Sequence, residues 1–158
     1  MRGFLEANAD RMRSARALEP SDGVPVALSM TGHFISGYAG LPQGQLYLDA
    51  KTMFNAQSIV KRDFLGLTAF FPDFGVAVLP SAFGCQILWK QDDAPWVYPY
   101  AAEPSLIDAL EVPDPARDGL MPKAVAFYRY MESRAGAENV DFCSELGPYD
   151  TASLIRGD

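Results

Sequence analysis

Two residues of this sequence are well suited to acid–base or ligand chemistry, and both are expected in loops. His33 is the only histidine among 158 residues, and Asp73 follows an apolar run in the order Phe71-Pro72-Asp73. An imidazole titrates near neutral pH, and a carboxylate at the edge of an apolar region can stabilise positive charge. The alternatives are a hydrogen-bonded loop histidine and a turn aspartate, because Pro-Asp is common in turns.

The two cysteines, Cys85 and Cys143, are far apart and lack CxxC spacing. This usage is typical of free thiols in a reducing cytoplasm, and Cys143 is expected in the core. A zinc site built from this chain would need both cysteines, His33 and a carboxylate to converge. We therefore expect this chain to bind no metal by itself.

Composition narrows the classes of partner. The chain has 13 basic and 20 acidic residues and a net charge of −7, which argues against binding to nucleic acid or to a membrane surface. Its apolar stretches are interrupted well before the ~20 residues that a membrane helix needs. The first 18 residues mix charges of both signs and lack the apolar segment of a secretory signal. We expect a cytoplasmic protein with a packed core.

The sequence predicts alternating strands and helices, which would position His33 and Asp73. Apolar spacing predicts helices over 5–18, 48–64, 103–110, 121–135 and 150–156. Short apolar runs predict strands over 24–30, 66–71 and 140–146. Residues 31–38 are expected to form a loop, and 74–100 an irregular, β-rich excursion. Strand–helix units in this order indicate an α/β fold with a parallel sheet and right-handed crossovers.

Several short motifs have a characteristic order and spacing. They are the entry segment 18–26, Phe71-Pro72-Asp73 followed by the run 79–84, the Pro/Asp/Gly segment 113–122, and the turn 147–152 that begins with Gly-Pro. Together they resemble the uroporphyrinogen decarboxylase superfamily, which includes tetrapyrrole decarboxylases and cobalamin-dependent methyltransferases. The resemblance runs over nearly the whole chain.

The resemblance implies a TIM (β/α)8 barrel. Such barrels need about 250 residues, so residues 1–158 are expected to be the N-terminal portion, a partial barrel of the first three to four β/α units. An open edge of a parallel sheet would invite association. The remaining strands are expected from a longer chain, from a complementing chain, or from a homo-oligomer of a rearranged half-barrel.

The resemblance also selects candidate site residues, because barrel enzymes place function at the carboxyl ends of strands. In the decarboxylases, the aspartate that corresponds to Asp73 holds pyrrole N–H groups, so Asp73 is the candidate catalytic residue. The structural alternatives in the last predicted strand and turn are a cap of the next helix at Asp150 or Thr151 and a polar group in the barrel interior at Glu145. The candidate substrate-binding residues are His33, Phe34, Phe71, Glu145 and Tyr149.

Decarboxylases of this superfamily place arginines in the loop where this sequence has His33 and no preceding arginine. We therefore expect part of a corrinoid-dependent methyltransferase acting on a small methylated substrate. A corrinoid protein would be the partner and methyl carrier, zinc would come from the portion outside this chain, and the chain alone would be inactive. The alternatives are a uroporphyrinogen decarboxylase with a diverged arginine loop and a non-catalytic half-barrel subunit.

Overall fold

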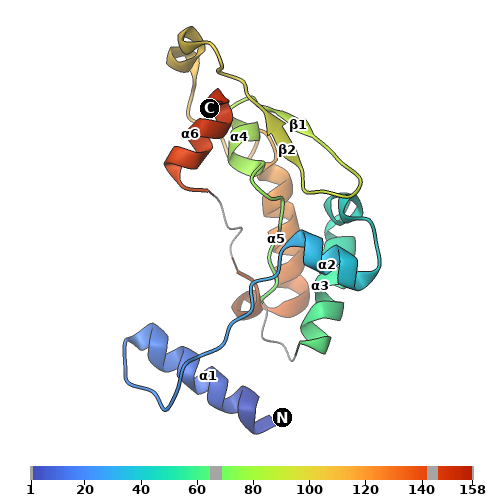
Figure 1. Cartoon of the computed structure of the whole chain (residues 1–158), viewed down its shortest axis with the longest axis vertical. Coiled ribbons are helices and arrows are strands. Elements are labelled where there is room, and N and C mark those ends of the chain that lie inside the picture. The colour runs from blue at the N-terminus through green and yellow to red at the C-terminus, as the bar shows by residue number, and fades with distance from the viewer. Residues whose placement is uncertain (1, 65–68, 142–145, 158) are drawn as a thin grey trace.

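The computed structural model describes residues 2–64, 69–141 and 146–157. Figure 1 shows α1 and the chain that follows it projecting from one end of a body formed by the other elements. In chain order the elements are α1 (Arg2–Ala17), α2 (Gly32–Ala39), the 3-10 helix η1 (Gln43–Tyr47), α3 (Ala50–Asp63), α4 (Val78–Ala82), β1 (Gln86–Leu88), β2 (Trp96–Tyr98), the 3-10 helix η2 (Pro104–Ala109), α5 (Met121–Ala135), the 3-10 helix η3 (Ala137–Asn139) and α6 (Pro148–Arg156).

Most of the expected helices are present. The helices predicted over 5–18, 48–64, 121–135 and 150–156 are confirmed as α1, α3, α5 and α6. The segment 103–110 forms the 3-10 helix η2. Asp49 caps α3, because its carboxylate accepts a hydrogen bond from the Thr52 amide at 2.9 Å.

The core lies between α3, α5 and the segment that begins at Phe70. Met53 on α3, Met131 on α5 and Phe74 are fully buried. The rings of Phe74 and Phe127 lie 5.0 Å apart between centroids. The apolar faces of α3 and α5 are therefore buried in this core, and burial of the apolar face is what allows an amphipathic helix to stabilise a fold.

A parallel pairing joins the second and third predicted strands. Phe70 forms a parallel bridge with Val140. The Phe70 amide donates to the Asn139 carbonyl at 2.9 Å, and the Asp141 amide donates to the Phe70 carbonyl at 2.8 Å. The predicted parallel contact is confirmed here, while residues 65–68 and 142–145 of these strands lie outside the described residues.

The strand predicted over 24–30 is wrong. The amide and carbonyl of Val26 bind the side-chain amide of Asn8, at 2.7 and 2.9 Å, rather than a neighbouring strand. A cleft of about 430 Å³ lies between α1 with the segment 26–28 and Ala69 with residues 138–141. Apolar composition is not sufficient for a strand, because a strand also needs a neighbour within hydrogen-bonding distance.

The loop predicted over 31–38 is also wrong, because Gly32–Ala39 forms α2. The Gly32 amide at the start of this helix donates to Asp73, 41 residues away in the sequence. Gly40 ends the helix in the left-handed conformation at φ 70°, which glycine adopts at little cost. The start of α2 is thus satisfied by a distant residue that local patterns do not reveal.

Residues 74–100 contain α4 and an antiparallel hairpin of β1 and β2, in which Ile87 pairs with Val97. The loop of this hairpin reaches η1, where the Gly44 amide donates to the Gln91 carbonyl at 2.7 Å. In Figure 1 the other end of the hairpin lies beside α4 and α6. No helix within the described residues is long and apolar enough to cross a membrane.

Candidate functional site

Asp73 connects the end of the parallel pairing to the start of α2. One carboxylate oxygen accepts the Gly32 amide at 2.8 Å, and the other accepts the Gly75 amide at 2.9 Å. Asp73 thus stabilises a turn and the start of a helix, in agreement with the alternative prediction of a turn aspartate. Each carboxylate oxygen has a second lone pair, so the same side chain can still accept a hydrogen bond from a ligand.

Two polar residues missed by the sequence analysis surround Gly32. A Cβ atom at position 32 would lie 3.0 Å from Gln43 Nε2 and 3.0 Å from Tyr47 Oη, so only glycine fits without displacing them. Gln43 Nε2 donates to Tyr47 Oη at 2.8 Å. Gln43 Oε1 is buried and has no hydrogen-bond partner among the described residues. The i,i+4 spacing of this amide and phenol is the one sequence signal that could have found the pair.

Burial raises the pKa of Tyr47 to about 12. The negative charges of Asp73 and Asp93 also raise this pKa, while the hydrogen bond with Gln43 lowers it. The phenol of Tyr47 is therefore neutral over the physiological pH range.

His33 contacts the hairpin loop. Its Nε2 atom lies 3.0 Å from Asp93 Oδ1, and Lys90 Nζ lies 2.9 Å from the other oxygen of Asp93. The hydrogen bond from Lys90, followed by that from the Ala94 amide, lowers the pKa of Asp93. This geometry is that of a hydrogen-bonded histidine linking α2 to the loop after β1. With 60% of its side chain exposed, His33 also remains accessible to a ligand.

Phe34 and Phe71 have structural contacts of their own. Phe34 stacks on Tyr38 at 5.8 Å between centroids and meets Phe64 edge-on at 5.5 Å. The Phe71 amide donates to Gln57 Oε1 at 3.0 Å, and Gln57 Nε2 donates to the Phe71 carbonyl at 2.7 Å. Phe71 thereby fixes the backbone two residues before Asp73, whereas Phe34 belongs to an aromatic cluster on α2 and α3.

The last two candidates are not brought to Asp73. Tyr149 lies in the first turn of α6 and is 83% exposed. No hydrogen bond or ring contact joins it to Asp73 in the described part of the chain. Gly147, not Asp150, is the N-cap of α6. Glu145 lies outside the described residues.

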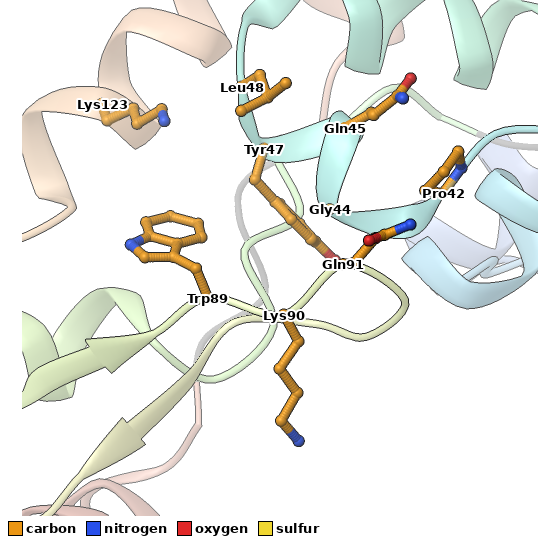
Figure 2. Close-up of a pocket in the computed structure, with 9 residues that line it drawn as sticks. All are labelled: Pro42, Gly44, Gln45, Tyr47, Leu48, Trp89, Lys90, Gln91 and Lys123. Carbon is orange, nitrogen blue, oxygen red and sulfur yellow. The ribbon is translucent and has the colours of Figure 1, made fainter.

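A pocket opens beside Tyr47, on the side of the hairpin loop (Figure 2). Its volume is about 440 Å³. The rings of Tyr47 and Trp89 lie 6.3 Å apart, and Lys123 Nζ lies 5.3 Å from the centroid of the Trp89 ring. The residues that line the pocket are Pro42, Gly44, Gln45, Tyr47, Leu48, Trp89, Lys90, Gln91 and Lys123.

The described residues contain no cluster of three or more His, Cys, Asp or Glu side chains that could hold a metal ion. Cys85 is buried, and burial raises the pKa of its thiol. A thiol in this setting is a poor metal ligand because the thiolate is disfavoured. Cys143 lies outside the described residues. The donors on these residues therefore do not fit a zinc ion.

One solved structure has the same fold over most of the chain. It is a methyltransferase from Methanosarcina mazei, with a TM-score of 0.68 and 22% sequence identity, matched over 92% of this chain and 44% of that protein. The chain thus spans less than half the length of this structural relative. No curated protein matches the chain.

The sequence profile of the family described as Uroporphyrinogen decarboxylase (URO-D) matches residues 7–157. This match covers nearly all of the chain, and the fold of the family is the TIM barrel. Asp73 follows the parallel bridge between Phe70 and Val140, and barrels place their functional residues at the carboxyl ends of parallel strands. The chain belongs to the uroporphyrinogen decarboxylase family.

Proposed function

We propose that the chain is part of a corrinoid-dependent methyltransferase that acts on a small methylated substrate. The observation that carries the proposal is the anchored carboxylate of Asp73, which follows the parallel bridge at Phe70 and lies next to a segment 30–34 that contains no arginine. The shared fold of a methyltransferase from Methanosarcina mazei supports the same class of reaction.

The anchoring of Asp73 gives its role in this proposal. Two backbone amides hold the carboxylate at a fixed position, so it needs no reorganisation when positive charge appears nearby. Asp73 would stabilise positive charge on the methylated substrate as its methyl group leaves. A corrinoid held by a partner protein would accept that methyl group. The donors of the described residues do not fit zinc, so any zinc would belong to the other part of the barrel.

Uroporphyrinogen decarboxylase activity is the second candidate, favoured by the family to which the chain belongs. A tetrapyrrole with many carboxylates needs fixed cations, and arginine is the residue that pairs with carboxylates bidentately. The segment Met30-Thr31-Gly32-His33-Phe34 offers an imidazole in that place. Tight binding of coproporphyrin would favour the decarboxylase, and an absence of binding would exclude it.

The remaining strands of the barrel are proposed to come from other polypeptide, since the chain spans 44% of its structural relative. The source would be a longer chain, a complementing chain or a second copy. A third reading is a non-catalytic half-barrel subunit. Light scattering on the isolated chain tests whether it needs a partner. If a partner is obligatory, the isolated chain is expected to associate or to be unstable, and a stable monomer would count against an obligatory partner.

A corrinoid-linked methyl-transfer assay on the complete barrel tests the proposal. Asp73→Asn keeps the size of the side chain but removes its charge, and we expect it to lower kcat by about a hundredfold. Asp92→Asn, on an exposed position of the hairpin loop, is the matched control and is expected to keep wild-type turnover. Unchanged turnover in Asp73→Asn would remove Asp73 from the mechanism.

A further inference from the structure

The ammonium group of Lys123 contacts aromatic rings, whereas several other cations of this acidic protein contact carboxylates. Within residues 2–64, 69–141 and 146–157, the side chains of Arg11, Arg13, Arg62, Lys90 and Arg117 each pair with a nearby aspartate. Lys123 forms no such ion pair in this part of the chain. Instead its Nζ atom faces three aromatic rings, at 5.3 Å from the centroid of Trp89, 5.7 Å from Phe127 and 5.9 Å from Phe74.

The aromatic rings fix the position of the ammonium group without neutralising it. Ring faces attract a cation but carry no formal charge and accept hydrogen bonds only weakly. An ammonium has three N–H donors, so Lys123 retains donors for a negatively charged partner. The pocket of about 440 Å³ in Figure 2 lies on this side of Lys123.

The pocket offers one cation and one accessible aromatic face. In Figure 2 Lys123 and Trp89 lie on the same side of the pocket, whereas Lys90 points away from it. Lys90 is engaged with Asp93 at 2.9 Å. Trp89 is 47% exposed, and Leu48 above it is also exposed. A single uncompensated cation beside an exposed indole matches a ligand with one negative charge and a flat apolar body.

The wall that carries Trp89 is held in place before any ligand binds. The Gly44 amide donates to the Gln91 carbonyl at 2.7 Å, and a Cβ atom at position 44 would lie 2.6 Å from the Lys90 carbonyl oxygen. His33 holds the same loop through Asp93. Because the loop is tied to η1 and α2, little conformational entropy is lost when a ligand enters.

We propose that this pocket binds a small aromatic carboxylate, with the carboxylate on Lys123 and the ring against Trp89. The inference does not depend on methyl transfer, because it concerns residues outside the Asp73 hydrogen-bond network. The site accounts for a lysine that is held by aromatic rings and forms no ion pair with the described residues. Amides at the rim, on Gln45 and Gln91, provide further neutral donors.

The test is a titration of the ¹⁵N-labelled chain with sodium benzoate, followed by the indole N–H signals in ¹H–¹⁵N spectra. The two tryptophans are Trp89 and Trp96, and Trp96→Phe assigns them. We expect a saturable shift of the Trp89 signal and none of the Trp96 signal, which reports from β2. Benzamide, which has the same shape without the charge, is expected to bind at least about tenfold more weakly.

Lys123→Met keeps much of the packing but removes the charge, and it is expected to weaken benzoate binding by about tenfold or more. Lys123→Arg keeps the charge and is expected to retain binding. If Lys123→Met does not fold, Lys123→Gln and the benzamide comparison on the unmodified chain decide the question. Equal binding of benzamide and benzoate, or no Trp89 shift up to the solubility limit of benzoate, overturns the proposal whether or not the barrel transfers methyl groups.

Discussion

In two regions of the molecule a side-chain amide binds both backbone groups of one extended residue, but in the described part of the chain only one of the two extended segments pairs with a neighbouring segment. In the body, Gln57 of α3 binds both the amide and the carbonyl of Phe71. In the projecting region, Asn8 of α1 binds both the amide and the carbonyl of Val26. The first extended segment continues into the parallel bridge and the Asp73 site, whereas the second has no neighbouring strand within the described residues.

The difference lies in what covers each region. Met53 and Val60 of α3 are buried in the core, and Phe70, which forms the bridge, is buried and stacks on Phe54 of α3. Val24 is 82% exposed, and the α1 helix faces the cleft of about 430 Å³. An amide side chain can fix one residue of an extended segment, but burial of apolar surface is what makes the segment part of a core.

The largest expected effect is the loss of a buried methionine in the body. Met53→Ala leaves a cavity and is expected to lower the free energy of unfolding by about 2–5 kcal/mol. Met12→Ala, in partly exposed α1, is expected to cost less than about 1 kcal/mol. Urea denaturation of the two variants measures the difference, and equal losses would remove the distinction between the regions.

Removing the side-chain amides of Gln57 and Asn8 is expected to give a second, smaller difference in the free energy of unfolding. Gln57→Ala leaves the Phe71 amide and carbonyl without partners in a partly buried place, which is expected to cost about 1–3 kcal/mol. Asn8 is buried, but Val26 is 39% exposed. Water can therefore replace the lost hydrogen bonds of the Val26 backbone, and Asn8→Ala is expected to cost under about 1 kcal/mol. The same denaturation experiment applies. A larger loss for Asn8→Ala than for Gln57→Ala would mean that α1 packs more tightly than described.

The buried phenol of the body makes its stability sensitive to alkaline pH. Tyr47 has a pKa of about 12 in the folded chain, above the value of about 10 for an unfolded tyrosine. Stability from Tyr47 is therefore fully present below pH ~10 and is lost as the pH rises toward 12. Tyr47→Phe is expected to lessen this alkaline loss relative to the unmodified chain. An identical pH profile of the two proteins would contradict the burial of the phenol.

The smallest expected effect is in the projecting region. Arg11 and Asp22 form an ion pair at 2.7 Å, and Arg11 lowers the pKa of Asp22. Both groups are solvent-screened, so Asp22→Asn is expected to change the unfolding midpoint too little to measure in 0.15 M salt. A clear destabilisation would show that the segment after α1 is held more firmly than its exposure indicates.

Local patterns predicted much of the body. Apolar residues at helical spacing predicted both α3 and α5. The failures have a common cause, which is that they depend on contacts distant in the sequence. Composition at 24–30 favours a strand, but pairing depends on whether a neighbour reaches it. The α2 helix begins where Asp73 meets Gly32, and no local signal encodes that contact.

The sequence predicted single residues of the candidate site but not the contacts between residues that are distant in the sequence. Asp73 was identified from its place after an apolar run, and the resemblance gave its importance. Its hydrogen bonds to Gly32 and Gly75 depend on the packing of α2 against the strand end. Gln43 and Tyr47 were missed because their i,i+4 spacing does not reveal the close approach of both side chains to Gly32. His33 was predicted, but its partner Asp93 is 60 residues away.

The central claim is that the parallel bridge and the Asp73 site form one ordered unit, separate from the segment 26–30. Native-state hydrogen exchange followed by NMR tests it most directly, because exchange reports the opening of individual hydrogen bonds. The account predicts slow exchange of the Phe70, Asp141 and Gly32 amides and fast exchange across residues 27–30. Protection of residues 27–30 equal to that of Phe70, or rapid exchange of Gly32, would contradict it.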